Sequence, residues 1–484
     1  MEIEEVRVGD TEDIKAGYRG GCGADSYGSE VFIPDNIPDS AYLLEDGEEV
    51  GFPENPKEAI PSNQELRNTS MEQIYKELEN ALSSFTEKAR QEEYLEEIME
   101  ETGESKDMIL DDLELVEKMA DKNYYKGLMQ MGDTNLEKYM DDWNPALGYD
   151  EKAVPLGKGV NINPGHNMAA VVIPEVWRAL SKNSVLHKMP GDDQVTMRIM
   201  DEVYQEMDGP LADSFKTGYW PGGSEELEKN LFSEDYVMAW GSDSTIEAIK
   251  EEVAPTTRFI PFHFEFGSYL VDEEFQENYN IDDLYKIAED FSWGDQLLCF
   301  SPLMMAVEES ENTEKFMEDL ADVLEEYKEE YEMGKIPDNE KMKKTRAKRM
   351  ARDYDQLVSD FENDTVVVME DDLDKDDVNE FHSFRFVEGH KVEDLSEAID
   401  VLGSSENLQE FILATSDRKA EELRDKIAYT KANRIASPGG AAPSAPITWD
   451  GKHPLNEMVK WVTDERNGKI GFTDKVRFMI KRAL

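Results

Sequence analysis

Apolar residues recur at intervals of three and four positions between Ser70 and Met140, which is the spacing of helices with one buried face. The clearest run is Ile74, Leu78, Leu82 and Phe85. This pattern predicts a helical N-terminal section. Before it, residues 1–65 mix acidic residues with Gly, Pro and Ser, and Gly17–Gly28 has the composition of a loop.

From about residue 154, short apolar runs alternate with helical spacing. After a weakly apolar segment at Gly159–Ile162, the expected strands are Ser184–Lys188, Tyr236–Trp240 and Arg258–Phe264. The expected helices between them are Met168–Leu180, one built on Val195, Ile199, Val203 and Met207, and Ile246–Val253. Later elements are a helix at Glu314–Glu332, a buried strand at Thr365–Met369 and a helix at Asp417–Tyr429. Strands alternating with helices predict βαβ units around a parallel sheet.

One of the two cysteines, Cys299, comes directly before an expected helix start. Ser301 suits the N-cap, Pro302 suits the first helical position, and Leu303–Val307 continues with helix formers. A cysteine at a helix N-terminus is stabilised as a thiolate, so Cys299 is a candidate nucleophile. The alternative is that it is a small buried apolar residue between two large ones.

The chain carries 51 basic and 109 acidic residues, a formal net charge of −58. Because the acidic residues are spread along most of the chain, we interpret the excess as a solvated surface suited to a high-salt, halophilic cytoplasm. Such a surface repels nucleic acid phosphates and anionic membranes, so we expect neither as a partner. The chain starts without a basic region followed by an apolar core, which favours a cytoplasmic location.

The 484 residues, 39% of them apolar, allow two or three domains with a sizeable core. Two cysteines exclude a disulfide framework, and no Cys/His group has the spacing of a zinc site, so we expect no metal. The other cysteine, Cys22, lies in a Gly-Cys-Gly sequence that lacks the third glycine of a dinucleotide fingerprint. We therefore assign Cys22 no function.

The segment Asp295–Pro302 reads Asp-Gln-x-x-Cys-x-Ser-Pro. It resembles the active-site segment of the long-chain acyl-CoA reductases of bacterial luminescence operons, the LuxC-type branch of the aldehyde dehydrogenase superfamily. Similar motifs run from about Gly157 to about Val462, and Thr448–Gly451 with Met458–Val462 resembles the family's C-terminal signature. The resemblance implies an aldehyde dehydrogenase-like α/β fold, with a Rossmann-like cofactor domain and an α/β catalytic domain.

The expected domain order combines this resemblance with the local patterns. Residues 1–150 form an acidic, largely helical N-terminal section, and residues 151–270 form the nicotinamide-cofactor-binding domain. Residues 271–445 form the catalytic domain with the Cys nucleophile, and residues 446–484 form a C-terminal segment. Members of the superfamily commonly assemble through a C-terminal strand, so the resemblance also implies a homo-oligomer.

The turn Pro164–Asn167 resembles the family's Pro-Gly-Asn-x-Pro turn, whose asparagine amide helps to hold the substrate oxyanion. An amide NH₂ can donate to developing negative charge without a proton transfer, so the resemblance implies this role for Asn167. The sequence departs from the family by an extra residue, His166, and by Ala169 where proline is usual. The alternative is a turn asparagine that bonds its local backbone.

Two further matches concern the cofactor. Lys188, at the end of an expected strand, resembles the family's lysine that contacts the adenosine ribose and, in NADP users, its phosphate. Gly241 and Ser242 resemble the pair that lets the cofactor pyrophosphate approach a helix start. A cation and free N–H groups both suit a phosphate. The alternatives are a solvated lysine and an ordinary helix cap.

Glu265, in Glu-Phe-Gly, resembles the general base of aldehyde dehydrogenases. A glutamate buried beside phenylalanines has its pKa raised towards a value useful for proton transfer. The luminescence branch does not hold this glutamate reliably, and His263 is a rival for the same role. The alternative is that both are polar residues at a strand end. A basic cluster, Lys341–Arg349, either meets the phosphates of CoA or NADPH or pairs with acidic neighbours as a solvated face.

Together these matches imply an acyl-CoA reductase that forms a fatty aldehyde. In this reading the Cys299 thiolate attacks an acyl thioester, Asn167 stabilises the oxyanion, and NADPH (NADP or NAD) supplies the hydride. The acyl donor is an acyl-CoA or an acyl-protein, and the family implies an acyl-protein synthetase as a partner. The alternatives are an aldehyde dehydrogenase that oxidises aldehydes to acids, and a non-catalytic scaffold that kept the fold.

Overall fold

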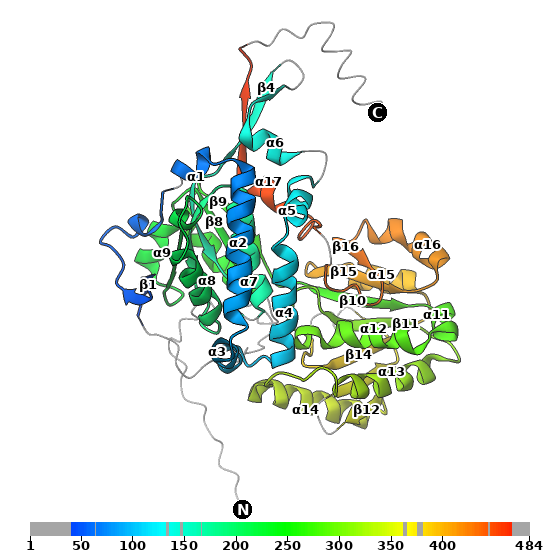
Figure 1. Cartoon of the computed structure of the whole chain (residues 1–484). Coiled ribbons are helices and arrows are strands. Elements are labelled where there is room, and N and C mark those ends of the chain that lie inside the picture. The colour runs from blue at the N-terminus through cyan, green and yellow to red at the C-terminus, as the bar shows by residue number, and fades with distance from the viewer. Residues whose placement is uncertain are drawn as a thin grey trace, which may run out of the picture.

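The computed structural model describes residues 40–466, apart from 63, 132–134, 146–148, 166, 362–364, 375–380 and 444–445. The segment Gly17–Gly28, which includes Cys22, lies outside these residues, and so does His166. The described chain forms two lobes, each built on its own sheet, and a projecting arm (Figure 1).

The first lobe contains a seven-stranded sheet in the order β2-β1-β7-β6-β5-β8-β9. The strands are β1 (Tyr42–Glu45), β2 (Glu48–Val50), β5 (Lys158–Ile162), β6 (Ser184–Lys188), β7 (Phe215–Tyr219), β8 (Tyr236–Trp240) and β9 (Arg258–Phe262). The strands from β7 to β9 are parallel, while β1 is antiparallel to both β2 and β7. The expected parallel sheet is confirmed.

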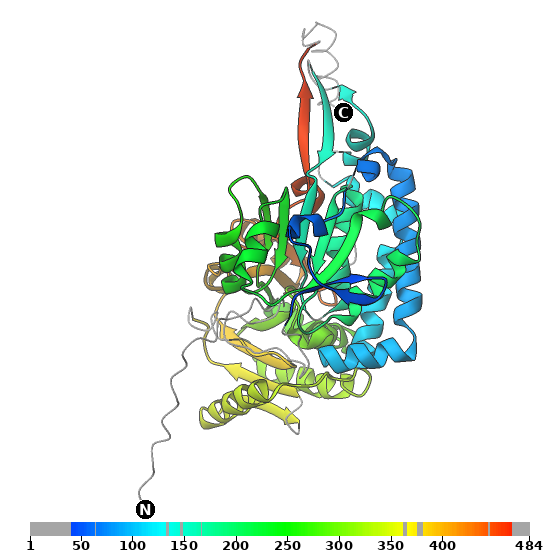
Figure 2. The same ribbon diagram turned by 90° about the vertical axis from the view of Figure 1, so that its left-hand side faces the viewer.

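Helices cover both faces of this sheet. They are α1 (Gln64–Asn68), α2 (Met71–Ala89), α3 (Glu92–Thr102), α4 (Lys106–Met119), α5 (Lys122–Met129), α6 (Leu136–Asp141), α7 (Met168–Leu180), α8 (Val195–Gln205), α9 (Glu225–Leu231) and α10 (Asp243–Glu252). The helices of the N-terminal section pack along one side of the lobe, with α2 and α4 against α7 (Figure 2). Ile74, Leu78, Leu82 and Phe85 all point into the core there, as their spacing predicts.

The second lobe contains another seven-stranded sheet, in the order β12-β13-β14-β11-β10-β15-β16. Its strands are β10 (Phe266–Val271), β11 (Pro302–Glu308), β12 (Leu357–Phe361), β13 (Thr365–Glu370), β14 (Phe386–Val392), β15 (Leu408–Ala414) and β16 (Arg434–Ala436). The helices are α11 (Glu273–Asn278), α12 (Ile281–Ser292), α13 (Thr313–Tyr327), α14 (Asp338–Asp353), α15 (Leu395–Leu402) and α16 (Asp417–Ile427). Every strand pairing except the antiparallel β12–β13 is parallel.

The prediction of a helix directly after Cys299 is wrong, because Pro302–Glu308 is the central strand β11. This strand lies between β10 and β14, and its residues are buried except at the last position. A strand covered on both faces has a continuous apolar sequence, which short windows do not distinguish from a buried helix. The proline that suited a helix start instead opens the strand.

A three-stranded sheet, β17-β4-β3, forms the projecting arm (Figure 2). Its strands are β3 (Asn144–Pro145), β4 (Asp150–Pro155) and β17 (Val459–Asp464), and α17 (Pro454–Glu457) precedes β17. Leu455, Met458 and Val459 pack in the core of the first lobe, and the Asn183 amide donates to the Met458 carbonyl at 2.9 Å. The last described part of the chain therefore completes the first lobe.

Candidate active site

A cavity of about 440 Å³ lies where the two lobes meet, and Cys299 and Asn167 both line it. Much of its remaining wall is apolar and comes from both the N-terminal helices and the first lobe: Leu115, Met119, Leu128, Ile173, Trp177 and Trp240. On the other side the wall comes from α12, the cysteine loop and the segment after β16. The arrangement suits an extended apolar ligand whose reacting end meets a thiol.

Cys299 sits in a tight turn between α12 and β11. The Ser301 N–H donates to the Leu298 carbonyl at 2.9 Å, and the Leu298 N–H donates to the Ser301 hydroxyl at 3.2 Å. Cys299 is 9% exposed and faces the cavity. Ser301 was expected to cap a helix, but its hydroxyl closes this turn instead. The turn thus presents a largely buried thiol to the cavity.

The two polar residues of the cysteine motif anchor the loop. Asp295 and Gln296 both have positive φ, 48° and 63°, a backbone region that costs energy for residues other than glycine. The Asp295 carboxylate accepts from Arg385 Nε at 3.1 Å. The Gln296 amide donates to the carbonyls of Pro302 and Phe386 and accepts from the Phe386 N–H. These bonds tie the cysteine loop to the starts of β11 and β14.

Asn167 is the N-cap of α7 and has φ 64° and ψ 96°. Its side-chain oxygen accepts from the Ala170 N–H at 2.9 Å, and its Nδ2 donates to Asp112 Oδ1 at 2.6 Å. A backbone N–H can only donate, so the bond from Ala170 fixes which end of the amide is the oxygen and leaves the nitrogen facing Asp112. Burial and the charge of Glu104 raise the pKa of Asp112 well above its ordinary value. The structure therefore brings Asn167 and Cys299 to one cavity.

Lys188 ends β6 in a buried position, with its Nζ 5.5 Å from the centre of the Tyr219 ring and 5.7 Å from that of Trp220. Burial lowers its pKa to about 8, although the charges of Glu228 and Asp192 oppose this. The rings of Tyr219 and Trp220 thus pack against this lysine.

Gly241 and Ser242 connect β8 to α10, as predicted, and Ser242 caps the helix by accepting from the Thr245 N–H at 3.3 Å. A Cβ atom at Gly241 would come within 2.7 Å of the Thr245 side chain, so a larger residue there would displace Thr245. Both Lys188 and this helix start lie at the carboxyl ends of parallel strands, where nucleotides bind in such sheets. A buried cation and a helix N-terminus fit a phosphate-bearing cofactor.

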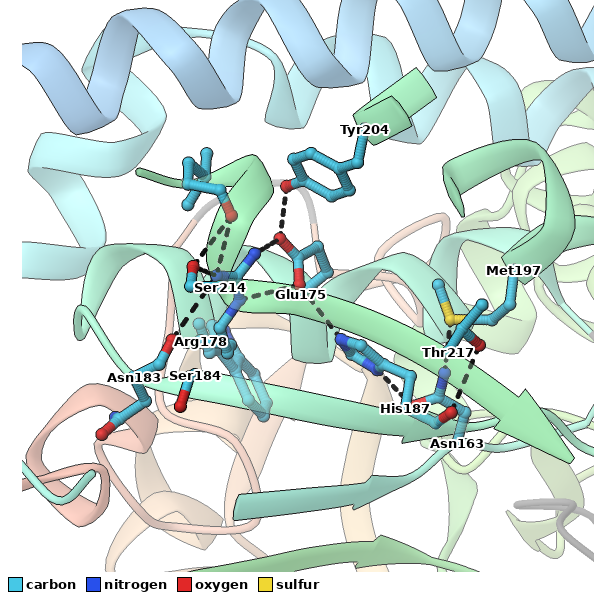
Figure 3. Close-up of polar contacts among 12 residues, drawn as sticks. Asn163, Glu175, Arg178, Asn183, Ser184, His187, Met197, Tyr204, Ser214 and Thr217 are labelled. Carbon is cyan, nitrogen blue, oxygen red and sulfur yellow. Dashed lines mark hydrogen bonds and ion pairs between the residues drawn. The ribbon is translucent and has the colours of Figure 1, made fainter. Parts of the chain in front are cut away.

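Figure 3 shows a buried polar cluster that includes Glu175, Arg178 and His187. Glu175 and Arg178 of α7 form a fully buried ion pair, and Tyr204 donates to the same carboxylate. The ring of His187 lies 3.0 Å from Glu175 and 3.1 Å from Asn163 Oδ1. Because His187 precedes Lys188 and Asn163 begins the turn to Asn167, the cluster ties α7 to the ends of β5 and β6.

Glu265 lies between β9 and β10, is 4% exposed and accepts from Gln409 Nε2 at 2.8 Å. The same amide donates to Asp450 at 3.1 Å. Burial, followed by the charge of Asp450, raises the pKa of Glu265 well above its ordinary value. His263 Nε2 is 3.9 Å from Glu265, and its Nδ1 lies 3.0 Å from the Phe264 carbonyl oxygen. Neither Glu265 nor His263 lines the cavity that holds Cys299.

The basic cluster Lys341–Arg349 lies on α14. Lys341 and Lys343 form ion pairs with Asp338 and Glu340 of the same helix, at 3.3 and 3.0 Å. Lys344 is buried and donates to the Phe384 carbonyl at 2.5 Å. The pairing with acidic neighbours is thus observed, and none of this helix lines the cavity.

Sequence reasoning missed two carboxylates that touch candidate site residues. Asp112 of α4 bonds the amide of Asn167, and Asp450 shares Gln409 with Glu265. Asp112 follows another acid, Asp111, and no motif marks it. The one signal is its spacing, three residues after Ile109 and four before Val116, which places it on the apolar face of the helix. Within the described residues, no group of three or more His, Cys, Asp or Glu side chains could hold a metal ion.

Comparisons with known proteins give the family and the fold of this chain. The sequence model of the family described as acyl-CoA reductase (LuxC) matches residues 66–461. No curated protein matches the sequence significantly. In the part of the chain that is described, no helix is long and apolar enough to cross a membrane.

Several solved structures share the fold at low sequence identity. An aldehyde dehydrogenase from Brucella melitensis biovar abortus 2308 gives a TM-score of 0.65 at 13% identity, covering 91% of this chain and 98% of that one. An oxidoreductase from Marinobacter aquaeolei gives 0.64 at 17% identity, covering 92% and 97%. An NAD-dependent benzaldehyde dehydrogenase from Corynebacterium glutamicum gives 0.65 at 14% identity, covering 90% and 96%.

Proposed function

The chain belongs to the LuxC acyl-CoA reductase family, which makes it an NAD(P)-dependent oxidoreductase of aldehyde or acyl substrates, and we propose that it reduces a fatty acyl-CoA to a fatty aldehyde. One observation carries the proposal. Cys299 and Asn167 line a single cavity whose wall reaches the apolar faces of α4 and α5. A nucleophile and an amide donor thus meet at an apolar site, which is what a long-chain thioester requires.

The apolar wall supplies the affinity for the acyl chain. Burying a methylene group contributes about 0.8 kcal/mol, so several carbons held against Leu115, Met119 and Leu128 would outweigh the loss of chain freedom. The thioester carbonyl then lies at the Cys299 end. The strongly acidic surface favours neither the CoA phosphates nor the cofactor phosphates, so buried cations such as Lys188 are needed at the sites where phosphates bind.

In the first step the Cys299 thiolate attacks the thioester carbonyl, and a C–S bond forms to the enzyme. The negative charge that develops on the carbonyl oxygen accepts hydrogen bonds from Asn167 Nδ2 and from the N–H of Cys299. The bond to the CoA sulfur then breaks, coenzyme A leaves as a thiolate, and the acyl group stays on Cys299 as a thioester.

NADPH, held by Lys188 and by Gly241–Ser242, would supply the hydride for reduction of this thioester. Asn167 can bind the oxygen of the thiohemiacetal that results on Cys299. When that intermediate collapses, the C–S bond to Cys299 breaks, the aldehyde is released and the thiolate is restored. Tryptophan and leucine side chains around the cavity exclude water from these steps.

The state of Glu265 supports this direction over oxidation to an acid. Acid formation needs a base that activates water against the acyl-enzyme. Glu265 keeps its proton at neutral pH because it is buried beside Asp450, and it does not line the cavity. Reduction to aldehyde does not need an activated water.

An absorbance assay at high salt tests the proposal. Purified protein receives NADPH and medium- or long-chain acyl-CoA, in parallel with Cys299→Ala and with Cys22→Ala as the matched cysteine control. We expect oxidation of NADPH that depends on acyl-CoA, is retained in Cys22→Ala and is lost in Cys299→Ala. NADH in place of NADPH decides the cofactor. Reduction of NAD(P)⁺ with aldehyde, together with no reaction from thioesters, would establish oxidation to acid instead.

A further inference from the structure

The helix α4 belongs to the N-terminal section, yet it contacts the candidate oxyanion donor directly. Asp112 lies in the middle of α4 and is 1% exposed. Its Oδ1 accepts from Asn167 Nδ2 at 2.6 Å, and its Oδ2 lies 3.4 Å from the Ala169 N–H at the start of α7. One carboxyl group therefore meets both the side chain of Asn167 and the first turn of the helix that Asn167 caps.

These contacts leave the amide of Asn167 one orientation. The Ala170 N–H occupies its oxygen and Asp112 takes one hydrogen of its Nδ2. The second Nδ2 hydrogen is the only donor of this amide without a partner among the described residues. Because Asn167 lines the cavity that holds Cys299, this hydrogen is the one available to a substrate oxygen.

The backbone of Asn167 is held from the same section. Its N–H donates to Glu104 Oε1 at 3.1 Å, and φ is 64°, a conformation that an asparagine keeps only with support. The neighbouring Gly103 carbonyl accepts from the Lys335 N–H of the second lobe at 2.7 Å. The Gly334 N–H in turn donates to Asp295 of the cysteine loop at 2.7 Å. The turn between α3 and α4 thus bonds Asn167 directly and is linked to the cysteine loop through Gly334 and Lys335.

We propose that Asp112 is a positioning residue for the acyl-transfer reaction, fixing the Asn167 amide so that a donor hydrogen faces the Cys299 cavity. This rests on the proposed roles of Asn167 and Cys299. Asp112 touches no substrate atom, since it lies behind Asn167 and does not line the cavity. Its effect on catalysis must therefore pass through Asn167.

A double-mutant cycle tests this dependence. Asp112→Leu keeps the branched shape of the side chain, although leucine is larger, and removes the acceptor, and Asn167→Ala removes the donor. We expect Asn167→Ala to lower kcat by about 10²-fold, and Asp112→Leu to lower it by about tenfold with little change in KM. In the Asn167→Ala background, Asp112→Leu should lower kcat by less than about twofold, because the residue through which it acts is absent.

Two further variants separate positioning from a structural role. Asp112→Asn keeps a carbonyl acceptor for Asn167 Nδ2 and should restore kcat to within about threefold of wild type. Asp111→Asn changes the adjacent acid of the same helix, which has no hydrogen bond to Asn167, and should leave kcat unchanged. If Asp112→Leu does not fold, Asp112→Ala takes its place in the cycle.

The reaction of Cys299 with iodoacetamide provides a readout that is independent of the oxyanion. Its rate should be equal in wild type and the Asp112 variants, since Asn167 acts on the substrate oxygen. A wild-type kcat in Asp112→Leu, or equal losses with and without Asn167, would overturn the proposal. If wild type itself shows no acyl-CoA-dependent oxidation of NADPH, the proposed function fails before the cycle is measured, so the two failures are distinct.

Discussion

Two buried glutamates of this protein have opposite electrostatic surroundings. Glu175 lies on α7 beside the sheet of the first lobe. Burial opposes its ionisation, but the charge of Arg178 and hydrogen bonds from His187 and Arg178 hold its pKa below the ordinary value. Glu265 lies at the junction of the lobes, where burial and Asp450 raise its pKa. Burial is thus similar in the two places. The directly paired Arg178 outweighs it at Glu175, whereas the charge of Lys452 does not outweigh it at Glu265.

The charge of Glu175 serves the structure, whereas Glu265 is a carboxyl group whose proton could in principle take part in chemistry. The Glu175 cluster joins α7 to β5 and β6 through a set of mutual partners, which favours a rigid scaffold (Figure 3). The region of Glu265 and Asp450 instead holds two neighbouring carboxyl groups that compete for charge. Protein stability should therefore respond in opposite directions when each glutamate is neutralised.

The largest expected effect follows from Glu175→Gln. The substitution leaves the Arg178 guanidinium buried without its counter-ion, which costs about 3–5 kcal/mol of unfolding free energy. Urea denaturation at high salt and pH 7 measures it, with the exposed Glu251→Gln as a control that should change nothing. If Glu175→Gln lowers the unfolding free energy by less than about 1 kcal/mol, the charge of Glu175 does not stabilise its region, and the contrast with Glu265 fails.

The next effect has the opposite sign. Glu265→Gln should stabilise the protein at pH 7 by about 2 kcal/mol, because unfolded Glu265 ionises whereas the folded carboxyl must keep its proton. Glutamine resembles the protonated acid in shape and has no charge to lose. The same denaturation experiment measures the change, and a destabilised variant would contradict the assigned protonation state.

The pH dependence of these differences sharpens the comparison. For a raised pKa, wild type loses stability relative to Glu265→Gln as pH rises above about 4.3, by at most about 1.4 kcal/mol per pH unit. For the lowered pKa of Glu175, the stability that wild type holds over Glu175→Gln is present above about 4.3 and is lost as pH falls. Denaturation from pH 3 to pH 8 in steps of one unit measures both slopes, that of Glu175 at the acid end and that of Glu265 from pH 5 upwards. Parallel slopes would show that the two environments are equivalent.

The smallest expected effect is on the reaction. Acyl-CoA-dependent oxidation of NADPH by Glu265→Gln should stay within about threefold of wild type at pH 7, since reduction needs no base at that position. His263→Ala, which lies beside Glu265, provides a second variant with the same expectation. A loss of about 10²-fold or more in either would place that side chain in the chemistry and remove the contrast with Glu175.

Alternating periodicity predicted much of the first lobe. The helix Met168–Leu180 and the strands Ser184–Lys188 and Tyr236–Trp240 have the expected bounds, because clear turn residues separate them. The helix expected over Leu303–Val307 is a strand instead. Its sequence is apolar at every position, and only the pairing with β10 and β14, which are distant in sequence, selects the extended form.

Candidate site residues could be proposed from the sequence where a motif marks them. A residue that is distinguished only by a contact in the folded structure could not. Cys299, Asn167, Lys188 and the Gly241–Ser242 pair all stood out by resemblance, and the first two line one cavity. Asp112 could not be found this way, since it belongs to no motif of the resemblance. Its contact with Asn167 arises from the packing of α4 on α7, which no local pattern encodes.

The strand β17 has a consequence for how the chain folds during synthesis. Residues 454–464 supply part of the first core, although the rest of that core is complete by residue 262. After residue 262 has been translated, the face around Asn183 and β4 therefore stays uncovered until the second lobe and β17 have been translated as well. Contacts between residues so far apart in sequence form slowly. The first half of this protein emerges from the ribosome early and is completed late.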